Sequence, residues 1–302
     1  MAKVYDIVVV GGGPAGLTAA LYGLRSGKSV LTIEKSVFGG QIVNSPKVEN
    51  IPGFESISGD EFGDLMLGQV RNQGGEVMFD EVTEIEPGDI CKLHLDLSGE
   101  VEAKTVVLAT GTKHRSLGLA NEEGLIGKGV HFCAVCDGNF YADKKVVLVG
   151  GGNSAFVEGN LLADVCKQVV MLQDLPVFTA DQKLQDSLNA KGNVEKHVST
   201  KVLEYLVSDS KLSGVKYLEN GEEKTVDCDG VFLAIGLIPD NKAFENVAEI
   251  DERGYFVADE SAITKTANIF VAGDCRSKAV RQVATACSDG ANAAIAACRY
   301  LG

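Results

Sequence analysis

The sequence predicts an α/β fold built from two Rossmann-like, three-layer dinucleotide-binding domains. Two glycine-rich stretches, 11–16 and 150–155, carry this prediction, because each follows an apolar, β-branched run and precedes a stretch with helical periodicity. The chain is also long enough, since 302 residues, of which 45% are hydrophobic, can form two separate cores. We therefore expect a globular protein in which one strand-turn-helix unit occurs twice.

The first glycine-rich stretch opens a complete dinucleotide-binding unit. The apolar run 6–10 predicts a parallel strand covered on both faces, and the pattern Gly-x-Gly-x-x-Gly at 11–16 begins a helix. The next apolar run ends in Glu34, at the distance from the glycines where this fold brings an acid to a ribose hydroxyl. The glycines let the backbone approach a pyrophosphate, and the N-terminus of the helix favours its negative charge.

The remaining elements follow in the order that two such domains require. Periodicity predicts a helix at 59–73, alternating strands at 77–85 and 91–97, strands at 102–110 and 146–149, a helix at 156–165, strands at 230–236 and 268–274, and an alanine-rich helix at 282–300. We expect the small residues of the last helix to let it approach a flat ring closely.

Cys133 and Cys136 are the only cysteines with the spacing of a redox pair. The other six are interpreted as small buried hydrophobic residues, namely Cys91, Cys166, Cys228, Cys275, Cys287 and Cys298. A zinc site would need a second pair or histidines at ligand spacing, and His131 alone does not supply them, so no metal is predicted. Asp137 is the only acid beside the pair and is the candidate proton donor and acceptor. The alternative is that Asp137 only shapes a turn with Gly138.

The charge and the distribution of apolar residues exclude several function classes. A net charge of −14 with no basic stripe argues against nucleic acid as a partner. Nowhere do about 18 apolar residues follow one another, which argues against a membrane span. No secretory signal precedes the first strand, so we expect a cytoplasmic protein.

The motifs together resemble the low-molecular-weight, bacterial-type thioredoxin reductases over nearly the whole chain. The resemblance rests on Cys-Ala-Val-Cys-Asp-Gly at 133–138, both glycine-rich stretches, Ala-Gly-Asp at 272–274 and Arg-Gln-Val at 281–283. It implies the fold of the FAD-dependent disulfide reductases and a homodimer. The FAD-binding domain would comprise 1–112 and 241–302, and an inserted NAD(P)H-like domain, 113–240, would carry the cysteine pair.

The same resemblance implies the roles of individual residues. Cys136 receives electrons from the reduced flavin, and Cys133 attacks the disulfide of thioredoxin. Asp274 can accept hydrogen bonds from ribitol hydroxyls, and the N-terminus of the last helix can stabilise negative charge on the reduced ring. The implied FAD contacts are Gly11, Gly13, Pro14, Ala15, Gly16, Glu34, Lys35, Gly40, Gln41, Asn50, Val82, Gly111, Asp274, Arg281, Gln282 and Val283.

The chain departs from NADPH-using members directly after the second strand of the inserted domain. Those members carry His-Arg-Arg-x-x-x-Arg there to meet the 2′-phosphate, whereas residues 173–179 read Gln-Asp-Leu-Pro-Val-Phe-Thr. Val157 also stands where the family usually has a glutamate. We therefore predict ferredoxin as the electron donor, as in the pyridine-nucleotide-independent flavin thioredoxin reductases, because one-electron transfer needs only a docking surface close to the ring.

Other donors and functions remain open from the sequence. Asp174 has nearly the spacing from Gly150 that would let it recognise an unphosphorylated ribose, which would make the protein an NADH- or NAD(P)H-dependent thioredoxin reductase. An FAD-dependent dithiol oxidase would also keep the cysteine pair and lack the nicotinamide site. A redox sensor without catalytic activity would differ from all of these in having flavin that no donor bleaches.

Overall fold

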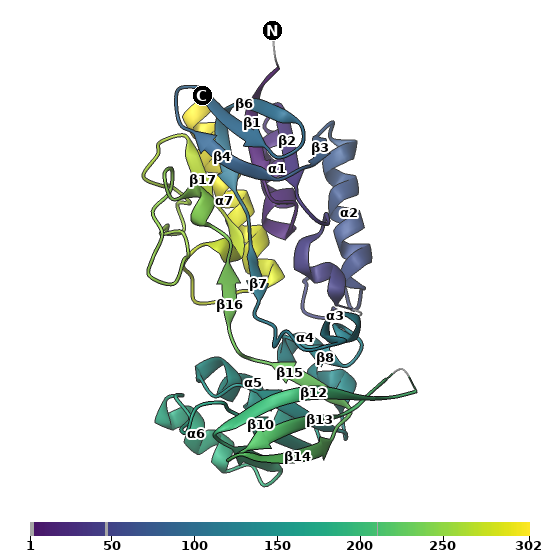
Figure 1. Ribbon diagram of the computed structural model, residues 1–302. Coiled ribbons are helices and arrows are strands. Elements are labelled where there is room, and N and C mark those ends of the chain that lie inside the picture. Colours follow the sequence, from purple (N-terminus) through teal and green to yellow (C-terminus); the bar gives the residue numbers. More distant parts are fainter. Residues whose placement is uncertain (1–2, 46–47, 210) are drawn as a thin grey trace. The chain divides into compact units, whose positions relative to one another are not determined.

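The chain folds into two compact units, one formed by residues up to 113 together with 238–302 and the other by 114–237 (Figure 1). The computed structural model describes residues 3–45, 48–209 and 211–302. The chain passes between the units through β7 (Thr112–His114) and β16 (Leu237–Pro239), which pair with each other. Within the described ranges, no helix combines the length and the apolar character needed to cross a membrane.

A parallel sheet with the strand order β3-β2-β1-β6-β17 forms the centre of the first unit. Every residue of β2 is buried, as expected for a parallel strand that is covered on both faces. The strands are β1 (Val4–Val10), β2 (Val30–Glu34), β3 (Glu76–Phe79), β6 (Gly99–Leu108) and β17 (Ile269–Val271).

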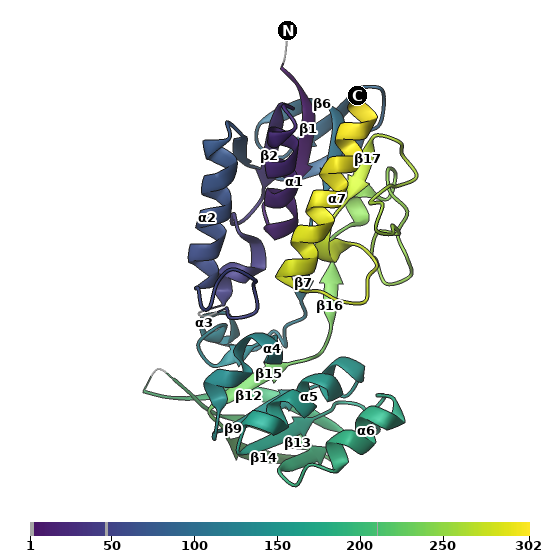
Figure 2. The ribbon, with the colours of Figure 1, turned by 180° about the vertical axis from the view of Figure 1, so that it is seen from behind.

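Three helices cover one face of this sheet (Figure 2), α1 (Pro14–Arg25), α2 (Gly59–Asn72) and α7 (Val283–Leu301). Pro14 stands at the first position of α1, where its missing N–H costs nothing, and the Ser58 side chain caps the first turn of α2. A Cβ on Gly290 of α7 would lie only 2.1 Å from the carbonyl oxygen of Ala15. The close contact between α1 and α7 therefore requires glycine at this position.

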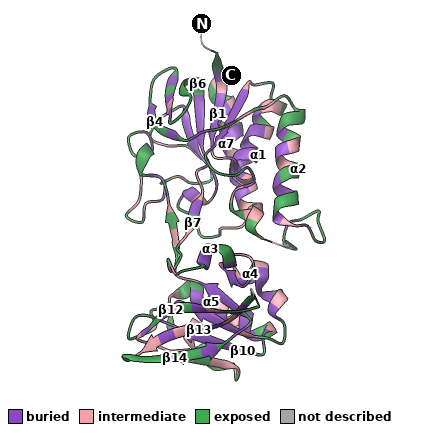
Figure 3. Ribbon diagram, turned by 45° about the vertical axis from the view of Figure 1, so that its right-hand side comes forward, coloured by how far each residue is buried: buried purple, intermediate pink, exposed green. Residues whose placement is uncertain are grey.

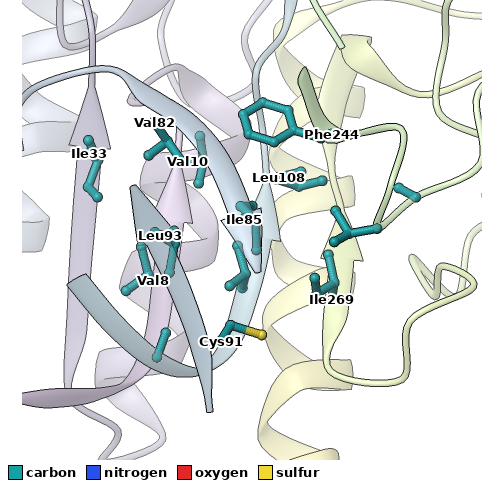
Figure 4. Close-up of a cluster of buried hydrophobic side chains, with 14 of the residues drawn as sticks. Val8, Val10, Ile33, Val82, Ile85, Cys91, Leu93, Leu108, Phe244 and Ile269 are labelled. Carbon is teal, nitrogen blue, oxygen red and sulfur yellow. The ribbon is translucent and has the colours of Figure 1, made fainter. Parts of the chain in front are cut away.

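An antiparallel meander of β4 (Val82–Glu86), β5 (Cys91–Leu95) and the first half of β6 covers the other face. Val82, Ile85 and Leu93 of the meander belong to one buried cluster with Val8 and Leu108 of the parallel sheet (Figure 4). The first unit thus has three layers, meander, parallel sheet and helices. Its short 3-10 helices are η1 (Gly40–Asn44), η3 (Lys242–Phe244) and η4 (Gly273–Cys275).

The single strand predicted at 77–85 is wrong, because the chain forms two strands there. β3 runs parallel to β2, whereas β4 runs antiparallel to β5. Between them, the Asp80 carboxylate accepts hydrogen bonds from the backbone N–H groups of Glu81, Leu97 and Ser98. An acidic side chain that takes up backbone donors in this way interrupts a strand.

The second unit repeats the architecture of the first. Its central sheet is parallel throughout, with the order β11-β10-β9-β15-β8. The strands are β8 (Val130–His131), β9 (Lys145–Val149), β10 (Gln168–Leu172), β11 (Val194–His197) and β15 (Gly230–Leu233).

An antiparallel sheet and a helical layer enclose this second parallel sheet. The antiparallel sheet, β12 (Thr200–Ser208), β13 (Lys211–Glu219) and β14 (Glu222–Asp227), packs on one face. The helical layer packs on the other and includes α4 (Ala134–Asp137), η2 (Gly138–Tyr141), α5 (Asn153–Val165) and α6 (Gln182–Asn189), while the short α3 (Glu122–Leu125) precedes β8. Figure 3 shows the strands of both parallel sheets buried between more exposed outer segments. The predicted α/β fold with two Rossmann-like, three-layer parts is confirmed.

Candidate functional site

Cys133 and Cys136 are joined by a disulfide, with their Cα atoms 5.3 Å apart. Cys133 is the N-cap of α4, and its sulfur accepts a hydrogen bond of 3.2 Å from the backbone N–H of Cys136. Both residues are partly exposed. A disulfide that solvent can reach is open to attack by an incoming thiolate, which is the requirement for thiol–disulfide exchange.

The remaining cysteines have no such environment. Cys91, Cys166, Cys228 and Cys275 are buried as predicted, and burial raises the pKa of the Cys166 thiol to about 11 and that of Cys228 to about 12. Thiols with such pKa values supply little thiolate near neutrality. The prediction of buried positions is wrong for Cys287 and Cys298, which lie on α7 and are partly exposed. Within the described residues, no group of three or more His, Cys, Asp or Glu side chains is placed to hold a metal ion.

Asp137 lies at the end of α4 and is only 6% exposed. Its Oδ2 atom is 3.1 Å from Nδ1 of His131, whereas its Oδ1 atom is buried and has no hydrogen-bond partner among the described residues. Gly138 has helical backbone angles of φ −57° and ψ −36°, so Asp137 and Gly138 do not form a turn that requires glycine. The backbone therefore gives no support to the alternative that Asp137 only shapes a turn with Gly138.

Glu158, which the sequence reasoning did not select, lies close to the cysteine pair. Burial raises the pKa of Glu158 to about 7, against a smaller opposing effect of the backbone N–H of Ala134, the residue after Cys133. The Oε2 atom is buried without a hydrogen-bond partner in the described part of the chain. The only sequence signal was an acid one turn into the helix that follows the second glycine-rich stretch.

Glu158→Gln is expected to make the protein more stable than the wild type at pH 8 and nearly equal to it at pH 5. Because the folded-state pKa lies above the ordinary value of 4.5, the carboxyl group stabilises the fold below that value and loses this contribution as the pH rises through about 7. The difference at pH 8 is on the order of 2–3 kcal/mol. Thermal unfolding followed by circular dichroism should show it as a midpoint about 5 °C higher. An equal difference in stability between Glu158→Gln and the wild type at both pH values would contradict a raised pKa of Glu158.

The first glycine-rich stretch forms the predicted tight turn between β1 and α1. Gly11 has a φ of +109°, and a Cβ there would lie 2.2 Å from the carbonyl oxygen of Ala109. A Cβ on Gly13 would meet no heavy atom closer than 3.8 Å, so the turn is open on that side. The buried Glu34 accepts a hydrogen bond of 2.6 Å from the backbone N–H of Gly12 and thereby fixes the turn.

The other predicted FAD contacts lie around the same edge of the first unit's sheet. Because β1, β2, β6 and β17 are parallel, their carboxyl ends share this edge, which is where open α/β sheets bind ligands. Asn50 donates a hydrogen bond of 3.2 Å from its side-chain amide to Gln282. The structure places Gly11, Gly13, Pro14, Ala15 and Gly16 after β1, Glu34 and Lys35 at the end of β2, Gly40 and Gln41 in η1, Val82 at the start of β4, Gly111 after β6, Asp274 after β17, and Arg281, Gln282 and Val283 at the start of α7.

Lys35 and Arg281, the two cationic residues among the predicted FAD contacts, have side chains that already bind other groups of the protein. The Lys35 ammonium lies 2.8 Å from both the Glu81 and Asp240 carboxylates. The Arg281 guanidinium carbon lies 4.2 Å from the ring centroid of Tyr255, and the guanidinium donates to backbone carbonyls at Asp274 and Arg276. Neither cation is free for a phosphate in this arrangement.

Asp274 presents a carboxylate that is prepared to accept a hydrogen bond. Its Oδ1 atom is buried and unpartnered among the described residues, with the Lys278 ammonium 3.9 Å away, and burial raises its pKa. A buried acceptor without a partner is costly unless a bound molecule supplies a donor. A ribitol hydroxyl would be such a donor, so Asp274, the open glycine turn and the shared sheet edge fit FAD.

A buried ion cluster holds the Asp274 turn on α7, and the sequence reasoning missed it. Asp289 accepts a hydrogen bond from the Gly273 N–H at 3.0 Å and pairs with Arg276 at 2.7 Å and Lys278 at 2.8 Å. These partners lower the pKa of Asp289 against the opposing effect of burial, and hydrogen bonding to Asp289 raises the pKa of Arg276. The cluster couples the loop after β17 to the last helix.

The second glycine-rich stretch forms the same kind of turn as the first. Gln173 packs against its second glycine, whereas the side chains next to the second glycine of the first stretch include Glu34. Gly150 has a φ of +133°, and a Cβ on Gly151 would lie 2.5 Å from Cδ of the buried Gln173. Residues 174–177 are exposed, and the sequence has no Lys or Arg from 173 to 182. The ammonium of Lys196 lies 5.7 Å from the ring centroid of Phe178 and is hydrogen-bonded to the Asn189 side chain.

Comparison with known proteins gives a consistent result over almost the whole chain. Residues 5–290 match the family described as pyridine nucleotide-disulphide oxidoreductase. The chain is 40% identical over 301 residues to a thioredoxin reductase of Listeria monocytogenes, covering 99% of this chain and 94% of the relative. It is 37% identical to a thioredoxin reductase of Bacillus subtilis, covering 99% and 95%. The crystal structure of thioredoxin reductase from Streptococcus pyogenes superposes with a TM-score of 0.92 at 36% identity, covering 100% of this chain and 99% of that one.

The fold, the disulfide and these similarities agree with one another. The chain therefore belongs to the pyridine nucleotide-disulphide oxidoreductase family, as an FAD-dependent disulfide reductase of the bacterial, low-molecular-weight thioredoxin reductase type.

Proposed function

We propose that this protein passes electrons from reduced ferredoxin, through FAD and the Cys133–Cys136 disulfide, to thioredoxin. The observation that carries the disulfide chemistry is the partly exposed disulfide beside the buried Asp137. Thioredoxin as the substrate is supported by the relatives from Listeria monocytogenes and Bacillus subtilis, which are named thioredoxin reductases. These names do not state the electron donor.

The proposed chemistry at the cysteines is two successive exchanges. FAD, when bound, supplies the two electrons that convert the disulfide into a dithiol. The Cys133 thiolate then attacks one sulfur of the thioredoxin disulfide, and a mixed disulfide forms while the other thioredoxin sulfur leaves. The Cys136 thiolate attacks Cys133, which restores the Cys133–Cys136 disulfide and releases thioredoxin as a dithiol. Asp137 takes the proton from the attacking thiol and returns it to the leaving thiolate.

The absence of cations after β10 supports a donor other than NADPH. A guanidinium–phosphate contact contributes about 1.5–3 kcal/mol, and residues 173–182 offer none. Gln173 fills the space against Gly151, and the exposed Asp174 would repel a 2′-phosphate. Ferredoxin delivers electrons singly and needs no nucleotide site in this unit.

NADH is the second candidate donor, and Asp174 is the observation in its favour. Asp174 is exposed and follows directly after β10, the position from which an acid can accept hydrogen bonds from both hydroxyls of an unphosphorylated ribose. An NADH-dependent enzyme would lose affinity for NADH in the variant Asp174→Asn, whereas a ferredoxin-dependent one would be indifferent to this change.

Anaerobic bleaching of the flavin tests the donor. We expect reduced ferredoxin to bleach the purified yellow protein within seconds and NADPH or NADH at micromolar concentration to leave its absorbance unchanged. Addition of oxidised thioredoxin to the bleached protein should then restore the yellow colour. Rapid bleaching by a nicotinamide nucleotide would overturn ferredoxin as the donor, and failure of thioredoxin to restore the colour would overturn thioredoxin as the acceptor.

The family resemblance also leads us to propose a homodimer. Light scattering during size-exclusion chromatography measures the mass directly, and a mass equal to one chain of 31.8 kDa would contradict this part of the proposal.

A further inference from the structure

Three buried polar side chains form a continuous hydrogen-bonded chain that ends at Asp137. His131 is the last residue of β8, Asp137 the last of α4 and Tyr141 the last of η2, and all three are less than 9% exposed. His131 Nδ1 lies 3.1 Å from Asp137 Oδ2, and His131 Nε2 lies 2.7 Å from the Tyr141 hydroxyl. The cysteine pair is inserted in the sequence between His131 and Asp137.

The surroundings hold the two rings in place. The His131 ring stacks on Phe232 of β15 with centroids 5.4 Å apart, and the Tyr141 ring meets the same Phe232 edge to face. Gly230 leaves room for Tyr141, because a Cβ there would lie 2.4 Å from the tyrosine ring. The cluster is therefore a packed feature of the unit and not a chance contact between surface side chains.

The directions of the two hydrogen bonds of His131 follow from its partners. The Tyr141 hydroxyl has a proton to donate, and the Asp137 carboxylate can only accept. Burial, with the nearby charge of Asp137, raises the pKa of Tyr141 well above its ordinary value, so its hydroxyl keeps its proton and can donate it to His131 Nε2. Because a carboxylate can only accept, Nδ1 of His131 donates to Oδ2 of Asp137. The second oxygen of Asp137 is left buried and without a partner among the described side chains.

We propose that His131 is a positioning residue for thiol–disulfide exchange, which holds Asp137 through Oδ2 and leaves Oδ1 as the atom that exchanges the proton. In the balanced step, the carboxylate removes the proton from the Cys133 thiol. The resulting thiolate forms a bond to one thioredoxin sulfur as the thioredoxin S–S bond breaks, and the leaving thiolate takes the proton back from Asp137. The inference rests on the proposed role of Asp137 in the proposed function.

The hydrogen bond from His131 fixes the orientation of the Asp137 carboxylate. The other groups whose charges reach this cluster are Cys166 at the end of α5, and Cys228 and Asp229 before β15. Both thiols ionise only well above neutral pH, because burial raises the pKa of Cys166 to about 11 and that of Cys228 to about 12.

Four variants separate positioning from packing. His131→Phe keeps an aromatic ring on Phe232 but removes both nitrogens. His131→Asn keeps a side-chain N–H donor close to the place of Nδ1, and His131→Gln keeps a polar partner for Tyr141 instead. Tyr141→Phe is the matched control that preserves the ring packing and removes only the hydroxyl.

The measurement is a single turnover, in which each FAD-loaded variant is first reduced with dithiothreitol, separated from the excess reagent, and then mixed with oxidised thioredoxin near neutral pH. We expect His131→Phe to slow the exchange by about 10- to 100-fold, as for loss of a hydrogen bond to a charged group. His131→Asn should recover most of the rate, because its side-chain N–H can still donate to Asp137. His131→Gln should resemble His131→Phe, and Tyr141→Phe should show a smaller loss, because Nδ1–H can remain on Asp137 without the tyrosine.

Equal exchange rates for wild type and His131→Phe would overturn the inference, as would equal losses in His131→Phe and His131→Asn. Flavin absorbance and thermal midpoints identify any variant that fails to fold. If His131→Phe fails to fold, the Asn and Gln variants decide between positioning and packing. The rate at which dithiothreitol reduces the Cys133–Cys136 disulfide should then be higher in His131→Asn than in His131→Gln if His131 positions Asp137. A wild-type protein that does not react with thioredoxin at all would contradict the proposed function, whereas the dithiothreitol reaction would still test His131.

Discussion

Cys136→Ser is expected to lower thioredoxin reduction by at least ~10³-fold while FAD remains bound. The variant keeps Cys133 but cannot form the disulfide that accepts electrons, and the proposed FAD contacts belong to the other unit of the chain. Steady-state turnover with thioredoxin measures the loss, and the flavin absorbance reports the bound cofactor. Unchanged turnover would remove the cysteine pair from the mechanism.

Cys166→Ser is the matched control for this experiment. Cys166 belongs to the same unit and is buried, and the high pKa of its thiol makes it unreactive near neutrality. We expect this variant to turn over thioredoxin at nearly the wild-type rate.

The same variants distinguish the two cysteines by a covalent product. If Cys133 is the attacking thiol, Cys136→Ser should accumulate a mixed disulfide with oxidised thioredoxin, because no second thiol is present to release it. Cys133→Ser should accumulate much less. Mass spectrometry under non-reducing conditions detects the adduct, and the reverse pattern would exchange the roles of the two residues.

Restoring cations after β10 is expected to create NADPH-driven reduction of the flavin. In the triple variant Asp174→Arg, Leu175→Arg, Thr179→Arg, each arginine that contacts the 2′-phosphate should contribute about 1.5–3 kcal/mol, or roughly 10- to 100-fold in affinity. The positions are exposed, so the substitutions should leave the core intact. The dependence of the flavin bleaching rate on NADPH concentration measures the gain.

The matched control is Asp174→Asn, which removes the repulsive charge without adding a cation. It should gain far less for NADPH than the triple variant, and NADH should gain little from the arginines because it lacks the phosphate. A wild-type protein that NADPH already bleaches at micromolar concentration would refute the premise. A triple variant that binds NADPH tightly without bleaching would show that binding alone is insufficient.

The sequence predicts those parts of the structure that depend on local pattern. The glycine turns, their flanking strands and the Cys133–Cys136 pair follow from spacing and from the backbone freedom of glycine, and the structure places them in the predicted elements. The boundary between β3 and β4 was not predicted, because the alternating pattern continues through Asp80. Its interruption depends on backbone donors at 97 and 98, far along the chain.

The missed features of the site all require tertiary contacts. His131 reaches Asp137 only because β8 and α4 fold back on each other, and Asp289 meets Arg276 only because α7 packs beside the loop after β17. The sequence shows that Gln173 stands where NADPH-using members have a histidine. It does not show that the Gln173 side chain packs against Gly151. A single sequence shows which side chains are available, whereas burial and partner geometry decide what each of them can do.

The repeated architecture gives the fifth strand of each parallel sheet an equivalent place. In the first unit that strand is β17, which pairs with β6 and leads into the turn that carries Asp274, and in the second unit it is β8, which pairs with β15 and leads into Cys133. The segment that follows each strand also supplies an aspartate with one buried carboxylate oxygen that has no partner among the described residues, Asp274 in η4 and Asp137 in α4. The two units thus present an acidic side chain at equivalent positions, and we propose that one holds a cofactor while the other serves sulfur chemistry.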